Sequence, residues 1–118
     1  MQEIIERIRN QQKLMGYTEM IQHSPEARMD YGRDIALALV KEVSEVLDEM
    51  PWKPWKSLWT QSMNEKKASL EVADVIVFAV VLHLTLCPGY SLEEAMQEVL
   101  DKIDNRVKTT NYGKQGEL

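Results

Sequence analysis

The sequence has few cysteines, histidines, glycines and prolines: one, two, five and four among 118 residues. Cys87 therefore has no partner for a disulfide within the chain, and there is no cluster of cysteines and histidines of the kind that binds zinc. Basic residues are outnumbered, giving a formal net charge of −5, so the basic footprint of a nucleic-acid or anionic-membrane binder is missing. We expect partners that are small molecules or proteins, with no nucleic acid and no membrane.

Targeting segments and long apolar runs are also missing. The charged first ten residues resemble neither a signal peptide nor a transit sequence, which favours the cytoplasm. The longest apolar run, residues 75–87, is too short to cross a bilayer and predicts a buried helix. A chain of this length is expected to form one domain that comprises residues 1–118.

Apolar residues at helical spacing predict an all-α fold, a four-helix bundle. Ser24 followed by Pro25 is typical of a helix start, and Ser91 with Glu94 three residues later forms a capping box. The expected helices cover, approximately, residues 2–15, residues 24–50, residues 67–87 and a segment that begins at residue 91.

The spacing also predicts which faces are buried. In the first helix, Ile4, Ile8 and Met15 form the expected apolar stripe, and Gln11 falls on the same stripe. In the second helix, Gly32 predicts a break. The last helix has an apolar face at Leu92, Met96, Val99, Ile103 and Val107. Together with the apolar third helix, this is more apolar surface than one small bundle can hide, so we expect a homodimer or homotetramer.

Five acidic residues border the buried faces of the second and third helices. Glu42, Glu45 and Glu49 fall within a sector of roughly 60° on one helix. Glu71 and Asp74 are three residues apart on the other, and their face continues as apolar residues, so both are expected to point inward. Burying unpaired carboxylates is costly, and like charges about 4 Å apart repel by roughly 1 kcal/mol even in bulk water. A positive group must therefore lie among them.

Two explanations for these acids remain open. They are either salt-bridge partners of Lys53, Lys56, Arg33 or Arg106, or ligands of a divalent cation. Because every candidate ligand is a carboxylate oxygen, the expected cation is Mg²⁺, with Mn²⁺ as a substitute. Mg²⁺ held by a few carboxylates keeps positions for water and substrate phosphates, which favours phosphate chemistry.

Two other classes of helical protein could also have such a sequence. A di-iron bundle uses Glu-x-x-His pairs, and neither His23 nor His83 has a glutamate three residues before it. A non-enzymatic helical interaction module would explain the methionine and tryptophan content. Such a module would be unchanged by metal and nucleotide.

Two acidic motifs together resemble a known signature. EVSE (residues 42–45) and EVAD (residues 71–74), with WKPWK (residues 52–56) after the first, resemble the ExxE and ExxD motifs of the all-α nucleoside triphosphate pyrophosphohydrolases. The similarity is greatest to the dimeric dUTPase branch, which has a similar Trp-Lys segment and a stretch like QQKL in its first helix. It extends from Gln11 to about Tyr112. In length the chain is closer to the compact MazG-like members, so a broad-specificity pyrophosphatase remains the alternative.

The resemblance implies Mg²⁺-dependent hydrolysis of a (deoxy)nucleoside triphosphate, with dUTP or another deoxypyrimidine triphosphate as substrate, to the monophosphate and pyrophosphate. It implies that the metal ligands are Glu42, Glu45, Glu71 and Asp74, and that Glu42, Glu45 and Glu49 are the catalytic carboxylates. The implied substrate contacts are Gln11 or Gln12 to the base, Trp52 and Trp55 beside the nucleoside, and Lys53, Lys56, Asn105, Arg106, Lys108 and Tyr112 for the phosphates. Some of these residues also have a structural explanation: Gln11 as a helix-edge amide, Trp52 and Trp55 as interface aromatic residues, and Lys53 and Lys56 as solvated basic residues.

Overall fold

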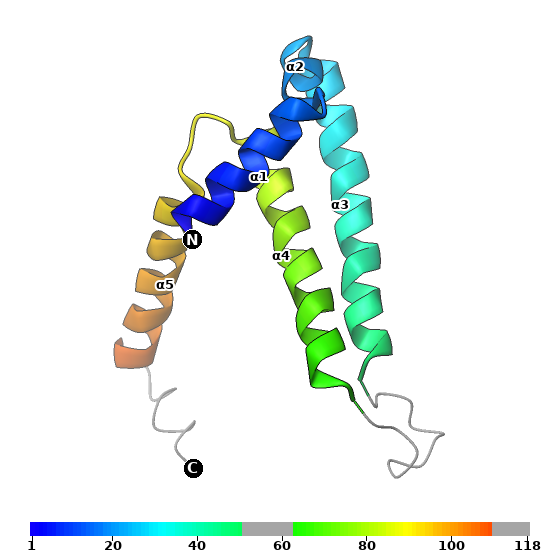
Figure 1. The fold of residues 1–118 in the computed structure, drawn as a ribbon. Coiled ribbons are helices and arrows are strands. Elements are labelled where there is room, and N and C mark those ends of the chain that lie inside the picture. The colour runs from blue at the N-terminus through cyan, green and yellow to red at the C-terminus, as the bar shows by residue number, and fades with distance from the viewer. Residues whose placement is uncertain (51–62, 110–118) are drawn as a thin grey trace.

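Helices account for the regular structure of residues 1–50 and 63–109, the part of the chain that this computed structural model describes (Figure 1). They are α1 (Gln2–Leu14), α2 (Tyr17–Gln22), α3 (Pro25–Asp48), α4 (Glu65–Leu86) and α5 (Leu92–Thr109). The predicted all-α class is confirmed, and the four expected helices form, with each end that was expected lying within two residues of the observed one. The short α2 is an addition that the spacing does not predict.

Side-chain caps begin three of the helices. Ser24 Oγ accepts a hydrogen bond from the Ala27 N–H at 3.0 Å, and Ser91 Oγ accepts one from the Glu94 N–H at 3.2 Å. Both predicted starts are therefore confirmed, because each cap satisfies a backbone donor that has no partner within its helix. The side chain of Asn64 supplies a third cap, at the start of α4.

α3 and α4 lie side by side and antiparallel, and they form the main helix pair (Figure 1). α3 continues without interruption through Gly32, so the expected break at this residue is wrong. A Cβ atom at position 32 would come within 2.7 Å of Leu86 Cδ2. The glycine therefore allows α4 to approach α3 closely, which is a packing role and not a helix end.

A small core forms where α1 crosses α4. Its buried apolar residues are Ile5, Ile8, Val80 and Val81. The expected burial of Ile8 is confirmed, but Ile4 and Met15 are more than half exposed, and Ile5 is buried in place of Ile4. Gln12, four residues after Ile8, follows the observed stripe, whereas Gln11 is exposed.

The apolar third helix of the sequence is less buried than expected. In α4, Val80, Val81 and Thr85 are buried, but Ile76 and Val77 are exposed. Residues 75–86 of the apolar run belong to this helix of 22 residues, and Cys87 caps its end. The whole helix, unlike the run alone, is long and apolar enough to cross a membrane, a test that core helices of soluble proteins also pass. Among the described residues, α1 and α3 are the main helices that cover α4, so much of its surface stays open.

α5 extends away from the α3–α4 pair (Figure 1), and none of its residues is buried. Its uncovered apolar residues are 42 to 56% exposed and comprise Met96, Val99, Leu100, Ile103 and Val107. The chain has an accessible surface of 9515 Å², whereas a compact monomer of this mass would have about 6600 Å². One copy of the chain therefore leaves a large apolar surface in contact with water.

Candidate metal centre

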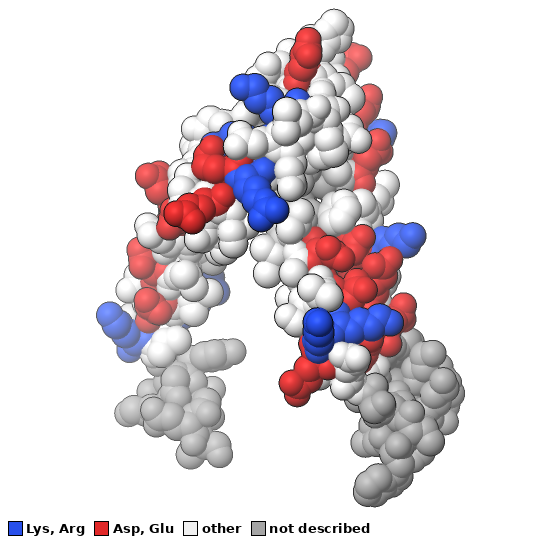
Figure 2. Space-filling model, viewed as in Figure 1, with Lys and Arg blue, Asp and Glu red and all other residues white. Residues whose placement is uncertain are grey.

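Three carboxylates from α3 and α4 meet in the half of the helix pair that lies away from α2. Glu42 and Glu45 on α3 and Glu71 on α4 each offer one oxygen, and these oxygens lie within 4.8 Å of one another. Figure 2 shows acidic side chains gathered over this part of the α3–α4 pair. We refer to these three residues as the acid cluster.

The antiparallel register of the two helices brings the acidic motifs together. Each turn toward the C-terminus of α3 is matched by a turn toward the N-terminus of α4. Glu45 and Glu42 on α3 come close to Glu71 on α4, Glu49 pairs with Lys67 one turn further along, and the charge of Asp74 acts on Glu42 from the other side. An ExxE motif on one helix therefore meets an ExxD motif on its neighbour, as their spacing on single faces predicts.

The acid cluster is partly buried and electrostatically strained. Desolvation, followed by the neighbouring Glu45 carboxylate, raises the pKa of Glu71, and the same two causes in the same order raise the pKa of Glu42. Glu71 Oε2 is enclosed and has no hydrogen-bond partner among the described residues. A buried carboxylate oxygen without a partner is a ligand atom available to a cation. Because all donors here are hard oxygens, the cluster fits Mg²⁺ or Mn²⁺.

Asp74, the fourth expected ligand, lies at the edge of the acid cluster. Its side chain is exposed and its oxygens are not part of the group within 4.8 Å. Its charge nevertheless contributes to the raised pKa values of Glu42 and Glu71. The expectation that both acids of α4 point inward therefore applies to Glu71 and not to Asp74.

Glu49 is held by a cation that the sequence analysis did not propose. It follows the last residue of α3, its side chain is 17% exposed, and Lys67 Nζ lies 3.1 Å from its Oε1. Within residues 1–50 and 63–109 the salt-bridge explanation therefore holds for Glu49, with a partner that was not among those expected; Lys53 and Lys56 lie outside the described ranges. Lys67 precedes Glu71 by four residues, one helical turn, which places it on the face of α4 that carries Glu71. Only the alignment of α3 with α4 makes Glu49 its partner.

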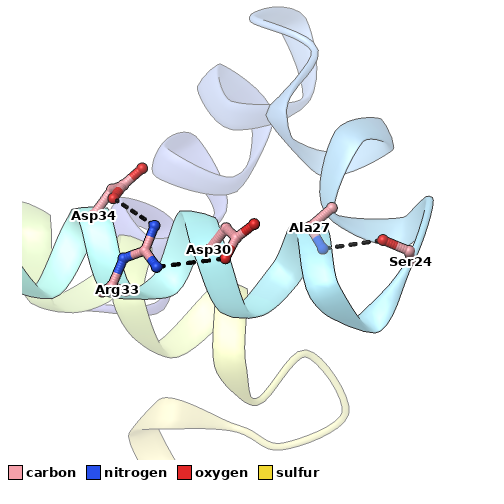
Figure 3. A network of polar contacts seen from close by, with 5 residues as sticks. All are labelled: Ser24, Ala27, Asp30, Arg33 and Asp34. Atoms are coloured by element: carbon pink, nitrogen blue, oxygen red, sulfur yellow. Dashed lines mark hydrogen bonds and ion pairs between the residues drawn. The ribbon is translucent and has the colours of Figure 1, made fainter.

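Arg33, one of the expected salt-bridge partners, lies on a different part of α3. Its Nη1 is 3.6 Å from Asp30 Oδ1 and its Nη2 is 3.5 Å from Asp34 Oδ1 (Figure 3). All three side chains are exposed, so these contacts are weak. Arg33 therefore neutralises its own neighbours and not the acid cluster.

The two glutamines expected to read the base lie at the end of α1 nearer α2. The Tyr31 hydroxyl donates a hydrogen bond to Gln12 Oε1 at 2.9 Å, whereas Gln11 is exposed. Tyr31 precedes Glu42 by eleven residues on the same continuous helix, which corresponds to a rise of about 16 Å. A single chain does not bring these amides to the acid cluster.

The other expected substrate contacts are also apart from the acid cluster or outside the described residues. Asn105, Arg106 and Lys108 are exposed on the last turns of α5, away from the α3–α4 pair (Figure 1). The residues outside the described ranges are Trp52, Lys53, Trp55, Lys56 and Tyr112.

Comparison with known proteins places the acidic motifs in a family context. A family model described as dUTPase matches residues 1–114, a span that includes all five helices and both acidic motifs. No match was found among curated proteins or among solved structures.

Proposed function

The chain belongs to the dUTPase family, as its acidic motifs predict, and we propose that it hydrolyses a deoxynucleoside triphosphate to the monophosphate and pyrophosphate. dUTP is the first expected substrate and dCTP the second. The observation that carries the proposal is the meeting of Glu42, Glu45 and Glu71. These carboxylates have the chemistry to hold the divalent cation that accompanies a triphosphate.

The acid cluster would hold Mg²⁺, with Mn²⁺ as a substitute and Asp74 as the expected fourth ligand. When bound, the ion neutralises phosphate oxygens and lowers the pKa of a coordinated water. Glu49, positioned by Lys67, lies one turn beyond Glu45 and would accept a hydrogen bond from the attacking water. Water supplies the new oxygen on phosphorus and one phosphoanhydride bond breaks, so no covalent nucleophile is required.

The active form is proposed to be a homodimer or homotetramer. The exposed apolar faces of α4 and α5 support this, because leaving so much apolar surface in contact with water is unfavourable for a monomer. The amides of α1 and the basic residues of α5 lie apart from the acid cluster in one chain. A second chain could therefore supply contacts to the base or phosphates.

The test is a panel of nucleoside triphosphates with Mg²⁺, read as pyrophosphate release. Glu45→Gln and Glu71→Gln should each lower activity by on the order of 100-fold or more, since ligand loss exceeds the usual 10- to 100-fold effect of a neighbouring residue. Glu65→Gln, which alters an exposed acid in the first turn of α4, serves as the control.

Similar rates on purine and pyrimidine substrates would favour the broad MazG-like alternative. No release from any triphosphate by folded protein would contradict the proposal.

A further inference from the structure

A separate cavity lies at the other end of the α3–α4 pair, where α1 and α2 meet the start of α3. Its volume is about 470 Å³, which is typical of small-molecule sites. Arg28, on its wall, precedes Glu42 by fourteen residues of continuous helix, a rise of about 21 Å. A small molecule in this cavity would not reach the acid cluster of the same chain.

The cavity wall is cationic although the chain as a whole is acidic. Arg9 and Arg28 line it, and none of the described residues on its wall is an aspartate or glutamate. The sequence has 19 acidic residues against 14 lysines and arginines, so an acid-free wall is a local departure from its composition. The wall also includes Ser24 and Pro25, at the positive end of the α3 dipole.

Arg28 has an unused hydrogen-bond donor. Its Nε is enclosed and has no partner among residues 1–50 and 63–109. Arg9 differs, because its guanidinium is paired with Glu6. A guanidinium donor that is withdrawn from water and lacks an acceptor is satisfied best by an anionic oxygen.

Part of the wall, which also includes the polar residues Gln12, Thr18, Gln22 and Thr85, suits a flat ring. Ile21, Leu84 and Pro88 provide apolar surface. Tyr17 also lines the cavity, and its orientation is fixed by stacking on Tyr31, with ring centroids 4.9 Å apart and an interplanar angle of 17°. A ring compound could contact these side chains while its anionic group approached Arg28.

We propose that this cavity binds a small organic anion, a ring compound that carries a carboxylate or phosphate, independently of the acid cluster. The cationic wall selects negative charge, and the apolar and aromatic wall selects the ring. An inorganic anion would satisfy Arg28 but leave the apolar part of the cavity unfilled, so it should bind more weakly.

Calorimetric titration in buffer containing EDTA tests the proposal, because the acid cluster repels anions when no divalent cation is present. The probes are AMP as a ring phosphate, benzoate as a ring carboxylate and inorganic phosphate as the ringless control. We expect AMP or benzoate to bind at least tenfold more tightly than inorganic phosphate, and the tighter of the two identifies the anionic group. Arg28→Gln should weaken that binding at least tenfold.

Matched variants locate the bound anion. Arg33→Gln removes an exposed arginine from the same helix and should change the dissociation constant by less than twofold. Glu45→Gln should also leave it unchanged. If Arg28→Gln does not fold, Arg9→Gln, which alters a partly exposed residue of the cavity wall, should weaken binding at least threefold. Absence of binding by all three probes, equal losses in Arg28→Gln and Arg33→Gln, or dependence on Glu45 would overturn the proposal.

Discussion

Lys67 Nζ on α4 lies 3.1 Å from Glu49 Oε1 on α3, one turn along both helices from the opposed pair Glu45 and Glu71. The lysine is 63% exposed and the glutamate 17% exposed, so the cation reaches in from solvent to a mostly covered carboxylate. The chain thus provides its own positive charge at the border of the acid cluster. The contact orients Glu49 beside the position proposed for the metal.

Replacing Lys67 with methionine keeps the length of the side chain and removes its charge. Glu49 would then be unpaired near other carboxylates, so the free energy of unfolding of the metal-free protein should fall by about 0.5 to 1 kcal/mol, a value reduced by solvent screening. Urea denaturation in EDTA measures the change. Lys66→Met, at an exposed neighbouring residue, is the control and should have a smaller effect. Equal effects of the two substitutions would show that the salt bridge contributes nothing.

The raised pKa values of Glu42 and Glu71 predict a pH dependence of stability without metal. A carboxyl group with a higher pKa in the folded state binds protons more tightly when folded, so its ionisation destabilises the fold. This free-energy cost is absent well below the ordinary carboxyl pKa of 4.5. It grows as the pH rises and reaches its full size above the raised pKa of the folded state.

We therefore expect Glu71→Gln, which resembles the protonated form, to be more thermostable than the native sequence near neutral pH and about equal to it near pH 4. Circular dichroism melting curves in EDTA at the two pH values provide the measurement. A difference in Tm that does not vary with pH would mean that Glu71 ionises normally in the folded protein.

Local signals predicted the helices well, because caps and apolar repeats act over a few residues. Ser24 and Ser91 each cap an amide three residues away, and both starts were identified. α2 was missed because six residues are too few to show a repeat. It follows Gly16, whose φ of 82° is a turn conformation that sequence spacing does not reveal. In α1 the burial of Ile8 agrees with its spacing, but Ile5 is buried in place of Ile4, because both residues are apolar and only the crossing over α4 selects Ile5.

The site was predictable to the extent that it depends on spacing within one helix. Two motifs at i, i+3 place their acids on single faces, and those faces do meet at Glu45 and Glu71. The Lys67–Glu49 salt bridge depends in addition on how α3 and α4 align, which spacing within either helix does not determine. The close approach at Gly32 and Leu86 is part of that alignment, and the sequence pattern suggested a helix break there instead.

The uncovered face of α5 predicts the effect of a charge placed on it. Ile103 is 45% exposed in one chain and is expected to be covered in the oligomer. Ile103→Lys should weaken association by roughly 100-fold or more, because an unpaired charge would be buried. Asp101→Lys adds the same side chain at an exposed polar residue of α5 and should leave the assembly intact. Size-exclusion chromatography with light scattering measures both, and a native sequence that is monomeric at micromolar concentration would contradict the expectation.

The two adjacent glutamines of α1 should have different effects on catalysis. Gln12 Oε1 already accepts a hydrogen bond from Tyr31, whereas the side chain of Gln11 is exposed and its amide can offer both a donor and an acceptor to a pyrimidine. Gln11→Ala should therefore lower kcat/KM for dUTP by about 10- to 100-fold and change kcat/KM for ATP little, because only the preferred base loses a specific contact.

Gln12→Ala should instead lower the free energy of unfolding by about 1 kcal/mol, as Tyr31→Phe should, with the ratio of dUTP to ATP activity preserved. Steady-state kinetics with both substrates, together with urea denaturation of each variant, would separate the two roles. If Gln11→Ala lowers the rates on dUTP and ATP equally, the amide does not read the base.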